Sequence, residues 1–149
     1  MGGVFMTVIT ILGAGGKMGN RVTQPLLDTK KYELRFVEKS EAGQARIREA
    51  GNTVMELDDA LKGTDVVIFT TPDALVRQIS DEVVPKLDPG TKILFLDPAA
   101  IAADRVKHRA DISCFVCHPT HPPVFSLLGE TDPAARRDYW GGGLATQAL

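Results

Sequence analysis

Four glycines stand close together near the N-terminus, in the stretch Gly13-Ala14-Gly15-Gly16-Lys17-Met18-Gly19. A glycine-rich turn between a buried strand and a helix lets backbone N–H groups at the helix start approach and bind phosphates. The spacing is G-x-x-G-x-x-G through Gly13, Gly16 and Gly19, and Met18 stands where the strict G-x-G-x-x-G pattern needs its last glycine. The loop alone does not distinguish a phosphate site from an ordinary glycine turn.

An acidic residue follows this loop at the spacing that dinucleotide-binding domains use. Glu38 comes about 20 residues after the loop, at the end of a predicted strand over Tyr32–Val37. A carboxylate at this place accepts hydrogen bonds from the adenosine ribose and repels a 2′-phosphate. We therefore predict that the loop holds the pyrophosphate of NAD. The alternative is that Glu38 is a solvated surface glutamate. The neighbouring Lys39 and Ser40 are able to accommodate a 2′-phosphate, so NADP stays an alternative cofactor.

Two other predicted strands end in residues that suit a ligand site. Thr70-Thr71-Pro72 follows a strand predicted over residues 65–70, and small hydroxyl residues there let a dinucleotide lie against the backbone. The alternative is that these residues only end the strand at Pro72 and bind no ligand. Asp97 ends a strand predicted over residues 92–96 at the same edge of the sheet, where it either faces the ligand or caps the following helix.

His118 ends the last predicted strand, over residues 112–117. On a parallel sheet this position faces the same crevice, close to where a nicotinamide ring would lie. A histidine there can take the proton from a substrate hydroxyl as the carbon that bears the hydroxyl loses hydride. We predict His118 as the catalytic residue, with His121 as a second candidate. The alternative is a histidine that only hydrogen-bonds the next loop.

Cys114, Cys117, His118 and His121 also match the residue types of a zinc site, and Cys114 to His118 matches the C-x-x-C-H haem pattern. Side chains three residues apart on a strand point to opposite faces of the sheet, which opposes shared ligation by the two cysteines. We therefore expect no metal site and two free cysteines buried in an apolar strand.

The elements that must position these residues alternate regularly along the chain. Short apolar, β-branched runs predict six strands. Met18, Val22 and Leu26 recur at helical spacing after the glycine loop, in a helix that Pro25 is expected to kink or shorten. This alternation predicts an α/β fold with a doubly wound, mostly parallel, Rossmann-like sheet. The predicted strands are Thr7–Leu12, Tyr32–Val37, 52–55, 65–70, 92–96 and 112–117, and the later helices are 42–50, 58–62, 75–84 and 99–107.

The chain has 149 residues, of which 44% are hydrophobic and 24% charged, which fits one globular domain with a sizeable core. Its formal net charge of -2 gives no reason to expect nucleic acid as a partner. No apolar run reaches the roughly 20 residues of a membrane span, so we expect a cytoplasmic protein with no membrane contact. We expect a dinucleotide-binding domain over residues 1–125, then a linker and the start of a truncated helical region over 126–149.

Three stretches together resemble the N-terminal NAD-binding domain of the prephenate dehydrogenase and phosphogluconate dehydrogenase superfamily. They are Ile11-Leu12-Gly13-Ala14-Gly15-Gly16-Lys17-Met18-Gly19, Val67-Ile68-Phe69-Thr70-Thr71-Pro72 and Cys117-His118-Pro119. The stretch Cys117-His118-Pro119-Thr120-His121-Pro122-Pro123-Val124-Phe125 is similar, more specifically, to the D-apionate oxidoisomerase group. The resemblance covers roughly residues 7–149.

This resemblance implies NAD-dependent oxidation of a small hydroxy acid or sugar acid, coupled in that group to a skeletal rearrangement. It implies that His118 contacts the substrate hydroxyl, and that a helical C-terminal domain completes the site and forms a homodimer. The main departure from the family is the length of the chain, from which we expect the helical domain to be absent and the chain alone to be inactive. The alternative function is a non-catalytic nucleotide-binding or redox-sensing module. A third hypothesis is a reductase similar to dihydrodipicolinate reductase, which only the glycine loop supports.

Overall fold

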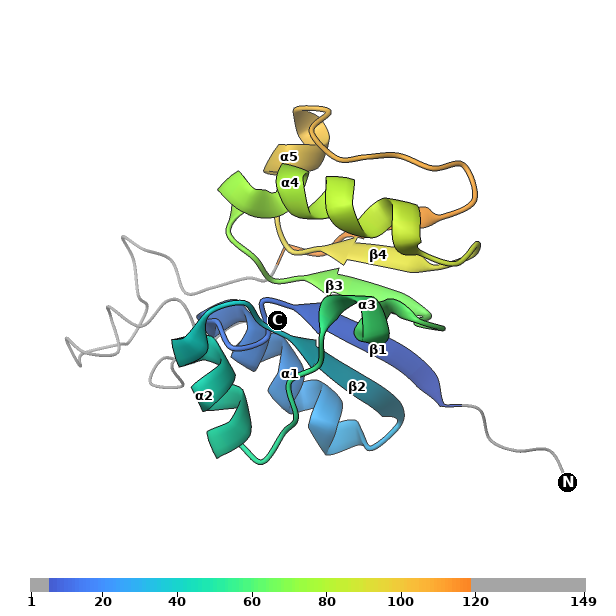
Figure 1. The fold of residues 1–149 in the computed structure, drawn as a ribbon. Coiled ribbons are helices and arrows are strands. Elements are labelled where there is room, and N and C mark those ends of the chain that lie inside the picture. Colours follow the sequence, from blue (N-terminus) through green and yellow to red (C-terminus); the bar gives the residue numbers. More distant parts are fainter. Residues whose placement is uncertain (1–5, 119–149) are drawn as a thin grey trace, which may run out of the picture.

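The computed structural model of the protein describes residues 6–118. In this part of the chain, five parallel strands form one sheet in the order β2-β1-β3-β4-β5 (Figure 1). The strands are β1 (Thr7–Leu12), β2 (Tyr32–Val37), β3 (Val66–Phe69), β4 (Lys92–Phe95) and β5 (Ser113–Val116). The helices are α1 (Lys17–Thr29), α2 (Glu41–Glu49), α3 (Leu57–Leu61), α4 (Asp73–Val83) and α5 (Ala99–Ala102), with a 3-10 helix η1 (Val84–Lys86). The predicted α/β, Rossmann-like fold is confirmed.

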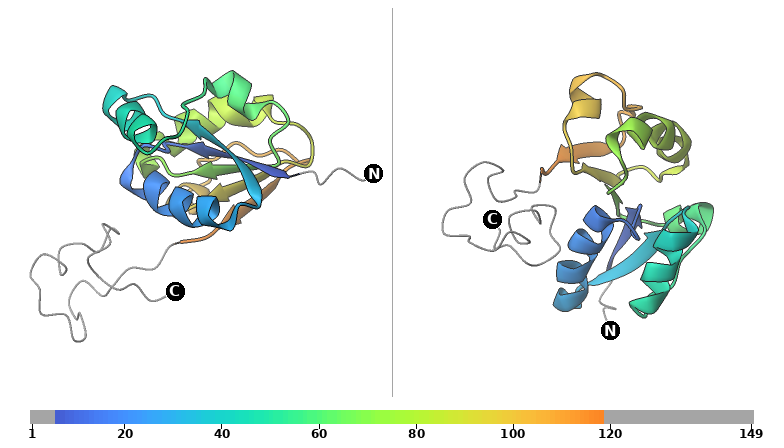
Figure 2. Two further views of the ribbon diagram at one scale, coloured as in Figure 1. Left: turned by 90° about the horizontal axis from the view of Figure 1, so that it is seen from below. Right: turned by 90° about the vertical axis from the view of Figure 1, so that its left-hand side faces the viewer.

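Side chains along each central strand alternate between two hydrophobic clusters, one on each face of the sheet. Leu12, Phe69 and Phe95 belong to the cluster that α3 and α4 cover, and Ile11 and Ile68 belong to the cluster that α1 covers. Figure 2 shows α1 and α4 on opposite sides of the sheet. This burial on both faces explains why these strands read as continuous apolar runs in the sequence.

The strand order changes direction between β1 and β3, and this is where the carboxyl-end loops part to leave a crevice. The chain leaves β1 toward β2 on one side and returns to β3 on the other, so the loops after β1 and β3 diverge. Open α/β sheets bind ligands at such a switch point. The Thr70 hydroxyl donates to the Leu12 carbonyl at 2.7 Å, which ties the end of β3 to the end of β1.

The prediction of a strand over residues 52–55 is wrong. The described sheet has five strands, whereas six were predicted. Val54 makes only an isolated parallel bridge to Phe36, on the outer edge of β2. The Met55 N–H also donates to the Phe36 carbonyl at 2.8 Å. Because α3 begins at Leu57, the chain leaves this edge before a ladder of hydrogen bonds can form.

Two helix predictions also need correction. Helix α1 has 13 residues and runs through Pro25, because Val22 and Leu26 on either side of the proline pack against the sheet cluster. The helix predicted over 99–107 ends much earlier, at Ala102. The chain then takes a left-handed conformation at Asp104, with φ 52°, which turns Val106 into the core, where it is 4% exposed.

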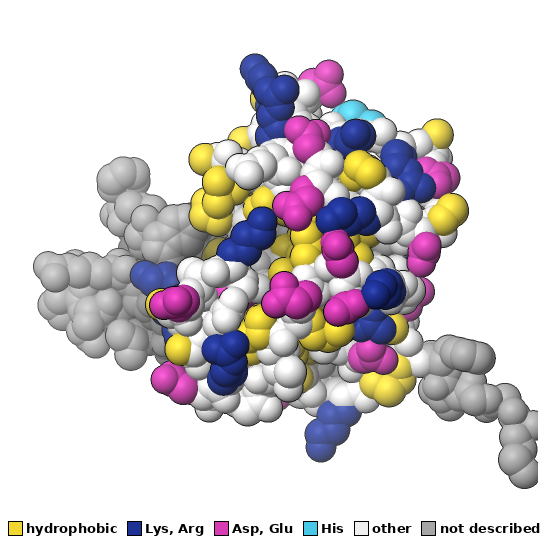
Figure 3. Space-filling model, viewed as in Figure 1, with side chains coloured by type: hydrophobic (Ala, Val, Ile, Leu, Met, Phe, Trp, Pro, Cys, Tyr) yellow, Lys and Arg dark blue, Asp and Glu magenta, His cyan; other side chains and the backbone are white. Residues whose placement is uncertain are grey.

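Charged side chains of both signs are interspersed over the face drawn in Figure 3. One ion pair joins Lys86 of η1 to Asp58 of α3, at 2.6 Å. Within residues 6–118, no helix is both long enough and apolar enough to span a membrane.

Candidate functional site

The glycine loop makes a tight turn from β1 into α1. Gly13 has φ 79°, in the left-handed region that glycine adopts without strain, and its N–H donates to the Val37 carbonyl at 2.9 Å. A Cβ atom on Gly13 would lie 3.0 Å from Cγ2 of Thr71. The Gly16 N–H donates back to the Gly13 carbonyl at 3.0 Å, and α1 begins at the next residue.

The first turn of α1 opens toward the crevice with its backbone donors free of helical partners. Gly16 is the N-cap residue and has no side chain, so Lys17, Met18 and Gly19 receive no side-chain cap, and the first turn contains no acid. The first N–H groups of a helix have no intrahelical acceptor, and the positive end of the helix dipole adds to their attraction for anions. This turn therefore fits the pyrophosphate of a dinucleotide.

Gly15 packs against the backbone of a second glycine, Gly43 in the first turn of α2. A Cβ atom on Gly15 would overlap the Gly43 backbone, and a Cβ atom on Gly43 would lie 2.6 Å from Cδ of Glu38. Our reading of the sequence missed Gly43. The available signal was a glycine inside a predicted helix. Glycine in a helix costs about 1 kcal/mol relative to alanine, so its presence indicates that close packing leaves no room for a side chain.

Glu38 lies beside the glycine loop, and its carboxylate accepts a hydrogen bond from the loop itself. Oε2 accepts a hydrogen bond from the Gly15 N–H at 3.1 Å. Oε1 accepts from the N–H and the hydroxyl of Ser40, both at 2.9 Å. Glu38 and the adjacent Lys39 and Ser40 line a cavity of about 270 Å³ that also reaches Gly13, Thr71 and Pro72.

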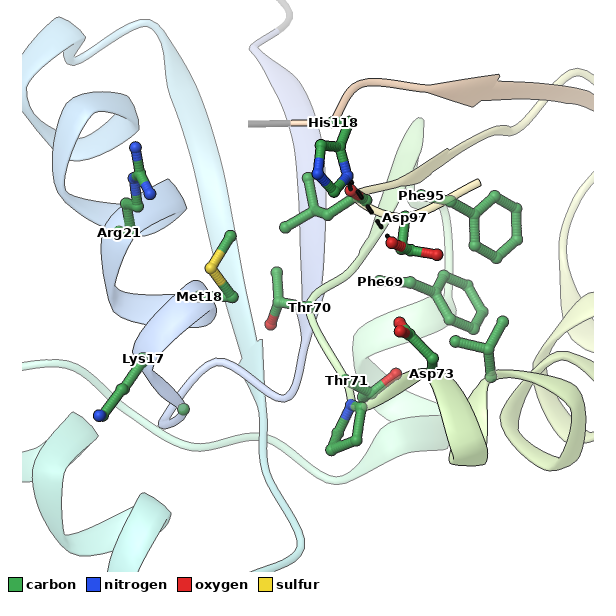
Figure 4. A pocket seen from close by; sticks show the side chains of 14 residues that line it. Lys17, Met18, Arg21, Phe69, Thr70, Thr71, Asp73, Phe95, Asp97 and His118 are labelled. Carbon is green, nitrogen blue, oxygen red and sulfur yellow. Dashed lines mark hydrogen bonds and ion pairs between the residues drawn. The ribbon is translucent and has the colours of Figure 1, made fainter. Parts of the chain in front are cut away.

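A second cavity, of about 460 Å³, opens on the other side of Thr70 and Thr71 (Figure 4). It brings together most of the predicted site residues: Gly16, Lys17, Met18, Thr70, Thr71, Pro72, Asp97 and His118. The Thr71 hydroxyl is buried there without a hydrogen-bond partner among the described residues. An unpaired buried hydroxyl between two cavities is a polar group that a bound ligand can satisfy.

His118 projects toward this second cavity, opposite Met18 and Arg21 of α1 (Figure 4). Its Nδ1 lies 2.9 Å from the Leu96 carbonyl and 3.7 Å from Oδ2 of Asp97. Because a carbonyl oxygen only accepts hydrogen bonds, Nδ1 carries the proton in the neutral ring. Nε2 is then the basic nitrogen, and with 59% of the side chain exposed it is accessible to a ligand.

Asp97 contacts the start of α5 and also lines the larger cavity. Its Oδ1 accepts the Ala99 N–H at 2.7 Å, at the start of α5, and its Oδ2 faces His118. Sequence reasoning did not include Arg21 and Asp73, which also line this cavity. Both had a usable signal, since Arg21 lies one helical turn after Lys17 and Asp73 opens the helix that follows Pro72.

Three predicted cofactor residues, Ala14, Gly15 and Gly19, line neither of these two cavities. Ala14 is 4% exposed and donates its N–H to the Val37 carbonyl at 3.2 Å. Ala14 and Gly15 line a third cavity, on the side of the loop between α1 and α2. His121 and the domain boundary at residue 125 lie outside the described residues.

The expectation of buried cysteines is wrong. Cys114 and Cys117 are free and exposed, because β5 is the edge strand of the described sheet. Phe115, which lies between them in sequence, is also 55% exposed. Among residues 6–118, no group of three His, Cys, Asp or Glu side chains is arranged to hold a metal ion.

Cys114 is expected to react slowly with alkylating reagents. The residue is exposed, but neighbouring atoms partly shield its thiol from water. This desolvation raises the pKa of the thiol above the ordinary value, so less thiolate is present at a given pH. Alkylation by iodoacetamide would be followed against pH in a Cys117→Ser variant, where Cys114 is the remaining cysteine. A rate profile with its midpoint at or below that of a free cysteine would contradict this burial.

Comparison with known proteins agrees with this geometry. The family model described as "Acetohydroxy acid isomeroreductase, NADPH-binding domain" matches residues 6–125. Two relatives named D-apionate oxidoisomerase are similar: one from Cupriavidus necator, 44% identical over 95% of this chain and 50% of its own length, and one from Rhizobium rhizogenes, 41% identical over 97% and 52%. The chain thus spans about half the length of the curated relatives it matches.

A solved structure carries the same fold with a cofactor present. It is the crystal structure of a semialdehyde dehydrogenase NAD-binding protein from Cupriavidus necator in complex with calcium and NAD. It is 43% identical, covers 96% of this chain and 51% of its own, and superposes with a TM-score of 0.79. The chain belongs to the family of the acetohydroxy acid isomeroreductase NADPH-binding domain, and it is a NAD(P)-binding domain of the oxidoreductase class.

Proposed function

We propose that this domain serves the NAD-dependent oxidation of a small sugar acid of the D-apionate type, coupled to isomerisation. The names of the relatives from Cupriavidus necator and Rhizobium rhizogenes support the substrate class. The observation that carries the proposal is the exposed His118, with Nδ1 turned to the Leu96 carbonyl, on the wall of the cavity that the start of α1 also lines. Homodimer formation through a helical C-terminal half stays a prediction.

In this proposal, the three parts of the cofactor would lie at separate places along the crevice. The first turn of α1 would bind the pyrophosphate, and the cavity beside Glu38 would receive the adenosine. The larger cavity, between Met18 and His118, is left for the nicotinamide and the substrate. Bound there, NAD supplies the hydride acceptor for the oxidation.

The protein's own residues would handle the proton and the substrate charge. Nε2 of His118 would accept the proton of the substrate hydroxyl as the carbon that bears this hydroxyl loses a hydride to NAD. The Leu96 carbonyl holds the ring through Nδ1, and Oδ2 of Asp97 lies 3.7 Å from the same nitrogen. Arg21, on the α1 side of the cavity, would offer positive charge to the substrate carboxylate.

Replacing His118 with alanine is expected to lower kcat on D-apionate by about 100- to 10,000-fold, the range that a general base contributes. The dissociation constant for NAD should stay within about threefold, since His118 lies away from the pyrophosphate turn. The test measures NADH formation with the full-length reading frame, because the relatives are about twice as long as this chain. Unchanged turnover in the variant would contradict the role of His118 as base.

The Glu38→Ala variant is expected to shift the ratio of NAD to NADP affinity toward NADP by at least about tenfold. The carboxylate at the adenosine cavity repels a 2′-phosphate, and like charges brought together cost several kcal/mol. Calorimetry with both cofactors measures the ratio. Glu41→Ala, which removes an exposed acid at the start of α2, is the matched control. An unchanged ratio in Glu38→Ala would show that Glu38 does not select the cofactor.

A further inference from the structure

A third cavity, of about 410 Å³, lies between α1 and α2, behind the glycine loop. Its wall is formed by both helices together with Phe36 of β2 and Asn52. It shares Gly16 and Lys17 with the cavity beside His118, and Gly16 and Arg46 with the cavity beside Glu38. Its inner part, which is lined by Thr23, Phe36, Ile47, Ala50 and Asn52, belongs to neither of those cavities.

The charged residues that line this cavity are all cationic. Lys17 and Arg46 both line it, and its lining contains no Asp or Glu. Nε of Arg46 donates to the Gly15 carbonyl at 2.7 Å, which fixes the guanidinium at the mouth of the cavity. Within residues 6–118, the two terminal nitrogens of Arg46 and the Lys17 ammonium make no hydrogen bond or ion pair. These donors suit an oxyanion, which a guanidinium binds through two parallel hydrogen bonds.

Neutral polar groups extend the same set of donors inward. Asn20 of α1 and Asn52 line the cavity, and their carboxamides have no partner among the described side chains. Thr23, also in the lining, is 6% exposed, and its hydroxyl is buried without a hydrogen-bond partner in the described part of the chain. Buried hydroxyls in native proteins are nearly always paired, so this group indicates a missing ligand atom or water.

We propose that the cavity between α1 and α2 is a second ligand site, which binds the phosphate or carboxylate group of a small molecule. Arg46 and Lys17 would hold the anionic group at the mouth. The apolar side chains of Phe36 and Ile47 in the lining leave room for a less polar body, next to the Thr23 hydroxyl. The ligand class is a small organic acid or phosphate ester, whose body would occupy the inner part of the cavity, apart from the dinucleotide.

The test is an NMR titration of the ¹⁵N-labelled protein with inorganic phosphate and, separately, with acetate. We expect saturable shifts of the backbone amides of Thr23, Ala50 and Asn52, which persist when NAD is present in excess. A response to phosphate alone would assign phosphate esters, and a response to acetate would assign carboxylates. Shifts confined to residues 13–19, or abolished by NAD, would place the anion in the pyrophosphate turn and overturn the proposal. No response to either anion would also overturn it.

Two variants and a matched control decide whether the named residues form the site. Arg46→Gln is expected to weaken anion binding by about tenfold or more, in keeping with a charge-assisted hydrogen bond of about 1.5–3 kcal/mol. Arg48→Gln on the same helix is the control, because Arg48 donates to Gln44 and lies outside the cavity. Asn20→Asp places a negative charge at an exposed position of the lining and should weaken binding without disturbing the fold. Wild-type affinity in both Arg46→Gln and Asn20→Asp would refute the site.

Discussion

Replacing Gly15 with alanine is expected to weaken NAD binding by about 10- to 100-fold. The added Cβ atom would overlap the backbone of Gly43, so α2 must move away from the glycine loop. That movement breaks the hydrogen bond from the Gly15 N–H to Glu38 and the one from Arg46 to the Gly15 carbonyl. Forcing an extra methyl into a packed contact costs about 1–3 kcal/mol, which gives the expected range. Calorimetric titration with NAD measures the effect.

The control for Gly15→Ala is Gly63→Ala. Gly63 has φ 63°, and a Cβ atom there would meet no atom within 4 Å. This substitution strains the backbone by about 1–3 kcal/mol, far from the loop, and should leave the dissociation constant for NAD unchanged. Wild-type affinity in Gly15→Ala would show that the contact between the two glycines does not shape the cofactor site.

The largest loss of stability is expected from Phe95→Ala. Phe95 in β4 is 1% exposed, and its ring centroid lies 4.7 Å from that of Phe69. Truncating a buried phenylalanine removes its transfer free energy and leaves a cavity, at a cost of about 3–5 kcal/mol. A small domain has about 5–15 kcal/mol in total, so urea unfolding of the variant should begin at much lower denaturant concentration.

Phe115→Ala is the matched comparison for Phe95→Ala. Phe115 lies on β5 and is 55% exposed, so its truncation leaves no internal cavity, and we expect a change below about 1 kcal/mol. Equal destabilisation by the two substitutions would contradict the assignment of the core to the interior of the sheet.

The sequence predicts the parts of the fold that depend on local patterns. Thr7–Leu12 and Tyr32–Val37 are runs of apolar or alternating residues bounded by clear breaks, and both were predicted to the residue. The helix after the glycine loop was also recognised, but it was expected to be kinked or shortened at Pro25, and it runs through that residue. There the packing of Val22 and Leu26 outweighs the local effect of the proline, and only the tertiary structure shows that packing.

The contacts that shape the site join residues far apart in the chain, and local patterns do not predict them. Glu38 was placed beside the loop by its spacing, but its hydrogen bonds to Gly15 and Ser40 depend on the position of α2. Gly43 escaped notice for the same reason. The protonated nitrogen of His118 depends on the Leu96 carbonyl, which comes from the neighbouring strand end.

The central claim is that the glycine loop and the first turn of α1 hold the pyrophosphate of a nicotinamide dinucleotide. Calorimetric titration of the wild-type protein with NAD and with NADP tests it most directly. We expect saturable binding of one dinucleotide per chain, tighter for NAD because of Glu38. If neither cofactor binds at millimolar concentration, the claim is contradicted.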